Sequence, residues 1–260
     1  MNTRPLGRAD AAAFLRRVVG PHVNSALGRL GLRVIRTGGS SDFSMRAALA
    51  KAAGRGPAVG TIIDVGASDG RWSETARQYF PAAAILLIEA NGAHRAGLES
   101  FRRRVPRSDF ILAAAGNTVG QLFFDGSDPF GGLASTEAIE RSSPVPATTI
   151  DHEVAARSLP GPYLIKLDTH GFELPILQGA EATLRRTDLL IVEVYNFTLC
   201  RGALRFYEMC GHLAELGFRP IDLCDPTHRP QDGVFWQCDI FFARSDRCEF
   251  LSNTYDASSD

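Results

Sequence analysis

Two carboxylates and two glycines stand close together in the segment Asp64–Gly70, which reads DVGASDG and follows a short apolar run. Gly66 and Gly70 allow the main chain to approach a ligand closely, and a helix that begins after Gly70 would offer free N–H groups. The spacing differs from the G-x-G-x-x-G of dinucleotide-binding loops, and Asp64 and Asp69 would repel a pyrophosphate. The segment therefore favours a cationic ligand without phosphate, such as S-adenosylmethionine.

Glu89 ends the next apolar run, 19 residues after Gly70. A carboxylate at the end of the second strand can accept hydrogen bonds from the hydroxyls of a ribose. This role is common to nucleotide sites and methyl-donor sites, so it indicates a ribose without identifying the cofactor. The residues expected to bind the cofactor are Asp64, Gly66, Ala67, Ser68, Gly70, Glu89 and Asn91.

A second group of ionisable residues lies in and after the apolar run that contains Lys166. Strand alternation places Lys166 and Asp168 on the same face, and an unpaired ammonium within an apolar strand is costly. We therefore expect Lys166 to pair with Asp168 or with Glu193. Asp168 and Glu193 should emerge at the carboxyl ends of two successive strands, with His170 just beyond the first. Asp168, His170 and Glu193 are the candidate catalytic residues.

Three chemical roles are open to this second group. His170, with an ordinary pKa of about 6.5, could act as the general base for a hydroxyl, or it could be a loop histidine that contacts main chain. Asp168 could be the base, could orient His170, or could serve only as the partner of Lys166. The oxygens of Asp168, Glu193 and Asn196 could also hold Mg²⁺, but no spacing requires a metal, so no metal ligand is assigned.

The elements that position these residues alternate along the chain. Alternation of strands and helices is typical of a parallel α/β sheet, and two late strands joined by a loop alone indicate an antiparallel hairpin at one edge. We predict a doubly wound, mostly parallel seven-stranded sheet of the Rossmann-like class I methyltransferase type, with this hairpin at its C-terminal edge. Strands are expected at 59–65, 84–89, 110–115, 163–168, 189–194, 218–224 and 235–243, and helices at 71–79, 91–105, 173–186 and 203–216.

The stretch 117–150 interrupts this alternation, because it is rich in Gly, Ser, Thr and Pro. It contains one strand-like run at 121–124, so we expect an irregular insertion or a hairpin near the active face. Within it, residues 125–136 could form a substrate lid or a plain surface hairpin.

Composition divides the chain into a basic helical N-terminal segment (1–55), a methyltransferase-type domain (56–246) and a C-terminal tail (247–260). Residues 1–56 carry ten Arg or Lys and two Asp, a net +8, but the whole chain has a net charge of −1, so no nucleic-acid partner is indicated. No apolar run approaches the roughly 20 residues of a membrane span, and we expect a cytoplasmic protein. Amphipathic helices expected within 11–36 could cap the sheet or contact a membrane surface.

Taken together, these segments resemble the FkbM family of methyltransferases. The resemblance runs from about residue 60 to residue 243 and rests on six ordered pieces: IDVGA (63–67), IEAN (88–91), VPATTID (145–151), KLDTHGFELPILQGA (166–180), VEV (192–194) and FWQCDIFF (235–242). It implies transfer of a methyl group from S-adenosylmethionine, typically to a hydroxyl of a sugar, polyketide or similar metabolite, with Asp64, Gly66 and Glu89 at the cofactor. Two residues depart from the family pattern: His170 stands where an acidic or amide residue is commoner, and Ala90 where proline is usual.

The sequence thus predicts an S-adenosylmethionine-dependent O-methyltransferase whose acceptor is a hydroxyl on a sugar, glycolipid or polyketide-type metabolite. Two alternatives stay open. An oxidoreductase with a nucleotide cofactor of the NAD type would use a similar sheet, but its glycine fingerprint is missing from this sequence. A non-catalytic binding module would keep the fold without the chemistry.

Overall fold

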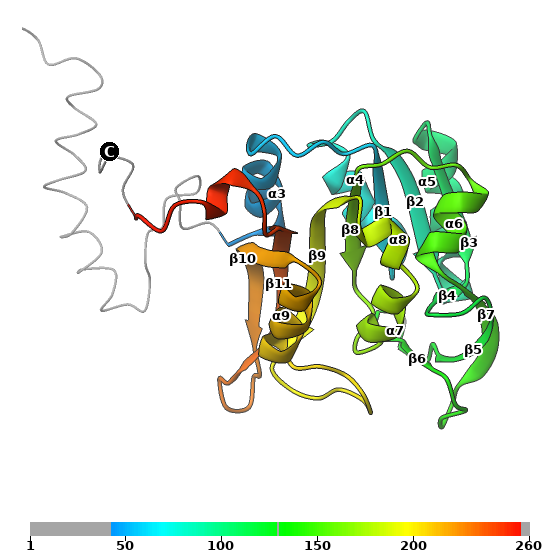
Figure 1. Cartoon of the computed structure of the whole chain (residues 1–260). Helices are drawn as coiled ribbons and strands as arrows, with labels where there is room; N and C mark the ends of the chain where they lie inside the picture. The colour runs from blue at the N-terminus through cyan, green and yellow to red at the C-terminus, as the bar shows by residue number, and fades with distance from the viewer. Residues whose placement is uncertain (1–42, 129, 256–260) are drawn as a thin grey trace, which may run out of the picture. The chain divides into compact units, whose positions relative to one another are not determined.

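A seven-stranded sheet forms the centre of the computed structural model, which describes residues 43–128 and 130–255 (Figure 1). Its strands are β1 (Thr61–Val65), β2 (Ala84–Glu89), β3 (Ser108–Leu112), β8 (Tyr163–Leu167), β9 (Thr187–Tyr195), β10 (Phe218–His228) and β11 (Phe235–Arg244). Their order across the sheet is β10–β11–β9–β8–β1–β2–β3. All neighbours are parallel except β11, which is antiparallel to both β9 and β10. The predicted doubly wound sheet with its C-terminal hairpin is confirmed.

The central strands are apolar along their whole length because helices cover both faces of the sheet. Every residue of β1, β2 and β8 is buried. Successive residues contribute to two separate apolar clusters: Ile63 and Ile165 belong to one, and Ile62 and Leu164 belong to the other. A parallel sheet covered on both sides requires such continuous apolar runs.

The helices divide between the two faces of the sheet. Buried residues of α3, α4 and α5 join the apolar cluster of Ile62, whereas those of α6, α7, α8 and α9 join the cluster of Ile63. The chain therefore winds outward from β1 to β3 and then returns to β8, which leaves a switch point between β1 and β8. The helices are α3 (Met45–Gly54), α4 (Arg71–Ala76), α5 (Arg95–Arg104), α6 (Ile150–Ala156), α7 (Glu173–Gln178), α8 (Glu181–Leu184) and α9 (Phe206–Glu215), with short 3-10 turns η2 (Gly92–His94) and η3 (Cys248–Phe250).

The insertion expected at 117–150 is more regular than its composition indicates. It belongs to a second, four-stranded sheet of order β4–β7–β5–β6, formed by β4 (Ala114–Ala115), β5 (Gly120–Asp125), β6 (Leu133–Ser135) and β7 (Ser143–Thr148). The strand expected at 121–124 lies within β5. The strand expected at 110–115 is divided, since the chain leaves the main sheet after β3 and pairs with β7 from Ala114 onward.

The single helix expected at 173–186 is two helices, α7 and α8, because the main chain turns at Gly179. A Cβ atom on Gly179 would overlap with the carbonyl oxygen of Gly116, so the corner packs directly on the loop that follows β4. A residue of α6 stabilises the start of α8. The carboxylate of Asp151 accepts hydrogen bonds from Ala182 N at 2.9 Å and Thr183 N at 2.8 Å. These contacts join segments far apart in the sequence, and helical periodicity does not reveal them.

Residues 43–55 pack on the sheet. Ala48, Leu49 and Ala52 of α3 are almost fully buried, and Lys51 forms an ion pair of 2.5 Å with Asp222 of β10. The compact unit begins at Phe43, so the boundary expected between residues 55 and 56 falls inside it. The helices expected within 11–36, and their membrane contact, lie outside the described residues. Among the helices that are described, none is long and apolar enough to cross a membrane.

Gly179 and Gly211 offer a matched test of this packing. Gly179→Ala should destabilise the fold by about 1–3 kcal/mol, because the new methyl group meets main chain that cannot move aside. Gly211→Ala, in the middle of α9, should stabilise it by about 0.5–1 kcal/mol, because a Cβ there meets none of the described heavy atoms within 4 Å. Urea denaturation of both variants measures the difference, and equal stabilities would contradict the close approach at Gly116.

Candidate active site

A cavity of about 710 Å³ opens at the carboxyl ends of the strands, beside the switch point between β1 and β8. Its volume is in the range of small-molecule sites. One part of its wall is apolar and comes mainly from the second sheet and α7. Another part is polar and comes from the ends of β8, β9, β10 and β11. The apolar part includes Ala113, Ala114, Ala115, Phe124, Phe172 and Ile176.

The loop after β1 forms the floor of the cavity at the switch point. Gly66 has φ +76°, and a Cβ atom on it would overlap with the carbonyl oxygen of Asp168. The loop therefore lies directly against the end of β8, which only glycine allows. Ala67 and Ser68 line the cavity beside Gly66, whereas Gly70 packs against the ring of Phe101 behind the loop.

The carboxylate of Glu89 joins the ends of β1 and β2. One oxygen accepts a hydrogen bond from Ser68 N at 2.7 Å, and the other accepts one from Asn91 N at 2.6 Å. Glu89 and Asn91 both line the cavity. A carboxylate oxygen has two lone pairs, so Glu89 keeps acceptor capacity for a ligand hydroxyl while it holds the two loops together.

Asp64, expected at the cofactor, lies behind the loop. Its side chain is 1% exposed and accepts a hydrogen bond of 2.7 Å from the hydroxyl of Ser73, in the first turns of α4. Burial raises the pKa of Asp64 to about 7, although the Ser73 hydrogen bond and the charge of Lys166 act in the opposite direction. Asp64 is not among the residues that line the cavity, so it fixes α4 relative to β1 and shapes the loop from beneath.

Lys166 is fully buried and lies between two carboxylates. Its ammonium is 2.8 Å from Asp168 Oδ2 and 3.2 Å from Asp239 Oδ1, and it lies over the ring of Trp72 at 6.0 Å. The expected pairing with Asp168 is confirmed. The second partner is Asp239 of β11 in place of Glu193, and Asp239 was not expected from the sequence. The only indication of this partner in the sequence is that Asp239 is a lone aspartate inside the apolar run 235–243. The strand order is needed to place it beside β9.

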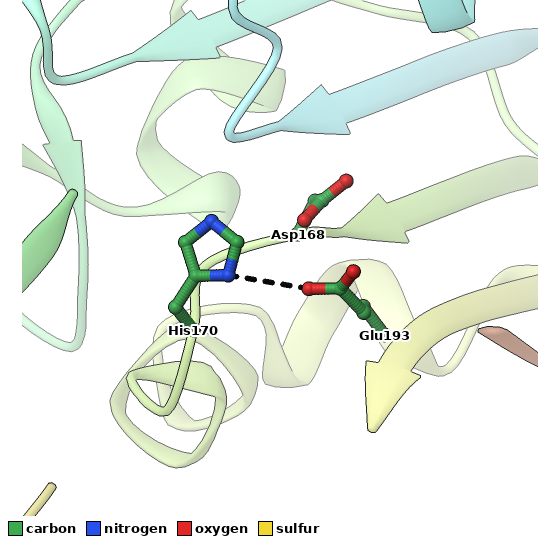
Figure 2. Close-up of side chains that lie close together, drawn as sticks. All are labelled: Asp168, His170 and Glu193. Atoms are coloured by element: carbon green, nitrogen blue, oxygen red, sulfur yellow. Dashed lines mark ion pairs between the residues drawn. The ribbon is translucent and has the colours of Figure 1, made fainter. Parts of the chain in front are cut away.

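Asp168, His170 and Glu193 point toward one another at the ends of β8 and β9 (Figure 2). His170 Nδ1 lies 3.2 Å from Glu193 Oε2. The hydroxyl of Tyr195 donates to the same oxygen at 2.5 Å, and Gln237 Nε2 donates to the other oxygen at 2.5 Å. Tyr195 and Gln237 were not expected from the sequence. Glu193 is thus held by three neighbours, and all five residues line the cavity.

Residues 64–220, more than half of the chain, match the family model of the methyltransferase FkbM domain. The chain belongs to the FkbM family. This is a family of S-adenosylmethionine-dependent methyltransferases, so the expected resemblance is confirmed. No curated protein matches the chain.

Solved structures of other methyltransferases are similar to this FkbM chain at low sequence identity. The FkbM methyltransferase of Methylobacillus flagellatus KT is 16% identical with a TM-score of 0.46, and the match covers 70% of this chain and 43% of that one. A precorrin-6y C5,15-methyltransferase of Geobacter metallireducens GS-15 is 13% identical with a TM-score of 0.43, over 76% and 87% of the two chains. The 1,6-didemethyltoxoflavin-N1-methyltransferase of Burkholderia thailandensis is 12% identical with a TM-score of 0.40, over 95% and 94%.

His170 is a cation at neutral pH in this FkbM chain. Burial alone lowers the pKa of His170, but the hydrogen bond and charge of Glu193, the charge of Asp168 and the carbonyl of Phe130 outweigh it and raise the pKa to about 9. Nδ1 lies 2.7 Å from the Tyr195 hydroxyl oxygen and 3.2 Å from Glu193 Oε2, and Nε2 lies 2.9 Å from the Phe130 carbonyl oxygen. Both protons of the imidazolium are therefore engaged, and His170 does not offer a free lone pair to an incoming hydroxyl.

Asp168 is the ionised carboxylate of the group. Burial alone raises the pKa of Asp168, but the charge and hydrogen bond of Lys166 outweigh it and hold the pKa below its usual value. The pKa of Glu193 is raised, mainly by burial. Asp168 is also more accessible, with its side chain 35% exposed, so it is the better placed of the two to accept a proton from a ligand.

The ligand set considered for Mg²⁺ does not assemble. The amide of Asn196 donates to the carbonyl of Phe235 at 3.2 Å, and Asn196 is not among the cavity-lining residues. Oxygens of Asp168 and Glu193 and a nitrogen of His170 lie within 4.8 Å of one another, but the imidazolium of His170 would have to lose its proton before it could bind a metal. The donor set does not fit Mg²⁺, which prefers oxygen ligands.

The raised pKa of His170 makes stability depend on pH. The folded-state pKa of about 9 exceeds the unfolded value of 6.5, so the stabilisation is fully present below pH 6.5 and is lost as the pH rises through 9. Its size is on the order of 3 kcal/mol, from 1.36 kcal/mol for each pKa unit. Urea denaturation between pH 6 and pH 10 should show this loss for the native chain and not for His170→Asn, which keeps a residue tolerant of φ +53°. An imidazole NMR titration with a midpoint near 6.5 would contradict the assignment.

Proposed function

We propose that this FkbM chain transfers a methyl group from S-adenosylmethionine to a hydroxyl oxygen of a sugar, glycolipid or polyketide-type acceptor. The observation that carries the proposal is that the Gly66 loop, Glu89 and the group around Asp168 line one and the same cavity. The charge of this cavity suits a cationic sulfonium. Five carboxylic side chains line it (Glu89, Asp168, Glu193, Asp225 and Asp239), whereas Arg71 and His170 are the cationic side chains among its described lining.

The loop and Glu89 would hold the cofactor. Gly66 lets the loop pack against Asp168, so that its main chain lines the cavity beside Ser68, and Glu89 keeps acceptor capacity for the ribose hydroxyls. Asn91 lines the same side, and Asp64 and Gly70 support the loop from behind. S-adenosylmethionine supplies a methyl group on a positively charged sulfur and becomes a neutral thioether when it loses that group.

Asp168 is the proposed catalytic base. The acceptor hydroxyl donates a hydrogen bond to Asp168, which aligns its oxygen with the methyl group and takes up its proton as the new O–C bond forms. Lys166 keeps Asp168 ionised and oriented. Glu193 and His170 are positioning residues in this mechanism: Glu193 orders Tyr195, Gln237 and His170, and the imidazolium binds the carbonyl of Phe130 at the rim of the cavity.

Calorimetric titration tests the cofactor assignment. S-adenosylhomocysteine should bind to the full chain, and NAD⁺ should not. Glu89→Gln should weaken S-adenosylhomocysteine binding by about tenfold or more, because the amide group sets a donor against Ser68 N–H or Asn91 N–H and leaves it unsatisfied. Glu215→Gln, on the exposed end of α9, is the matched control and should bind as the native chain does. Tight NAD⁺ binding without a response to S-adenosylhomocysteine would refute the proposal.

Asp168→Asn separates chemistry from binding. This variant should keep its affinity for S-adenosylhomocysteine within about twofold and lose methyl transfer by a factor of about 100 or more, the usual contribution of a general base. Transfer is measured with labelled S-adenosylmethionine against extract of the native cell, and the melting temperature of each variant checks that it is folded. Unchanged transfer by Asp168→Asn would remove Asp168 from the chemistry. If the native chain labels no fraction, the chain is a binding module.

A further inference from the structure

A loop of the second sheet contributes to the wall of the cavity. It joins β5 to β6, and the structure describes its residues 126–128 and 130–132. Both ends of the loop are closely packed. A Cβ atom on Gly126 would lie 3.3 Å from Asn91 Nδ2, and one on Gly132 would overlap with the ring of Phe124. Asn91 and Phe124 line the cavity, so the loop is anchored on the cavity wall at both of its ends.

The ring of Phe130, within this loop, lies among the elements that surround the proposed cofactor site. The guanidinium of Arg71, at the start of α4, lies 5.0 Å from the centre of the ring, and the ring of His94, in η2, lies 5.7 Å from it. The hydroxyl of Ser68 is 3.5 Å from both ring nitrogens of His94, and the Ser68 N–H donates to Glu89. The Phe130 ring is therefore next to the two loops that would hold the cofactor.

This ring is only partly covered by protein. Phe130 is 60% exposed although it lines the cavity. Removing a phenyl ring from water is favourable, and its face and edge pack well on other flat groups. A ligand that binds at Ser68 and Glu89 would complete the burial of the ring, and the ring would in turn cover the ligand.

The main chain of Phe130 contacts the group of residues around the proposed base. Its carbonyl accepts a hydrogen bond of 2.9 Å from His170 Nε2, and its N–H donates to Asp128 Oδ1 at 2.9 Å. The other ring nitrogen of His170 lies 2.7 Å from the Tyr195 hydroxyl and 3.2 Å from Glu193. Because the ring and the carbonyl belong to one residue, a movement of the ring away from the cofactor loops would also disturb the contact with His170.

We propose that Phe130 closes the cavity over the bound cofactor and that His170 holds Phe130 in this closed position. This inference rests on the proposed function for the placement of the cofactor at Glu89. The cofactor should leave faster when either the ring or the hydrogen bond to the carbonyl is lost. Closure also keeps water away from the methyl group during transfer. His170 is then a positioning residue that acts through Phe130.

The rate at which S-adenosylhomocysteine dissociates from the full chain tests the closure, and surface plasmon resonance measures it together with the association rate. Phe130→Ala should raise the dissociation rate by about tenfold and change the association rate by less than about threefold, because the ring stabilises the bound state. Val119→Ala is the matched control. Val119 is an exposed apolar residue next to β5 that does not line the cavity, and its substitution should change neither rate.

A second variant separates a held closure from simple contact with the ring. His170→Asn removes the Nε2 donor and keeps a residue that tolerates the φ of +53° at this position. It should raise the dissociation rate by about fivefold. Since both residues act through one closed position, their effects should not multiply: Phe130→Ala/His170→Asn should dissociate no more than about twice as fast as Phe130→Ala. Melting temperatures check that each variant is folded.

The possible failures can be told apart. The closure is overturned if Phe130→Ala releases S-adenosylhomocysteine at the native rate. The role of His170 in holding it is overturned if the dissociation rate of His170→Asn is native or if the two effects multiply. A native chain that does not bind S-adenosylhomocysteine at all would overturn the proposed function, and this inference with it.

Discussion

The buried ammonium of Lys166 is the interaction on which the rest of the site depends. An isolated charge in the middle of an apolar strand would be too costly, so β8 must have carboxylates beside it. Asp168 comes from the same strand, but Asp239 comes from β11 and reaches Lys166 only because β11 lies next to β9. The antiparallel insertion of the last strand is therefore part of the active site as well as of the fold.

The charge of Lys166 acts differently on the two carboxyl groups at the ends of β8 and β9. Lys166 holds Asp168 ionised, whereas Glu193, which receives Tyr195, Gln237 and His170, keeps a raised pKa because burial dominates. Neighbouring carboxyl groups whose environments separate their pKa values can take up distinct tasks in proton transfer. The two acidic residues at the ends of these adjacent strands therefore differ: Asp168 is the ionised carboxylate, and Glu193 organises the hydrogen bonds of its neighbours.

The sequence predicted those elements and loops whose structure depends on the pattern of neighbouring residues. Continuous apolar runs located the strands, and the glycine spacing with Glu89 located the loops at the cavity. Contacts between segments that are distant in the sequence could not be predicted. The turn of α7 into α8 depends on Gly116, and Asp64 faces α4 because Ser73 lies opposite it. Asn196 follows β9 as expected, but its amide turns to the Phe235 carbonyl, which only strand pairing determines.

His170 shows how such distant contacts change chemistry. In the sequence it is a histidine after a strand, the usual description of a general base. In the fold its ring lies between Glu193 and the Phe130 carbonyl, so each nitrogen meets an acceptor and the proton stays on the ring. The imidazolium offsets the charge of Glu193, which lies beside β11. Further along the sheet edge, Asp239 shares the ammonium of Lys166 with Asp168. The residue that departs from the family pattern therefore places a positive charge beside Glu193, where the sequence analysis expected the free lone pair of a base.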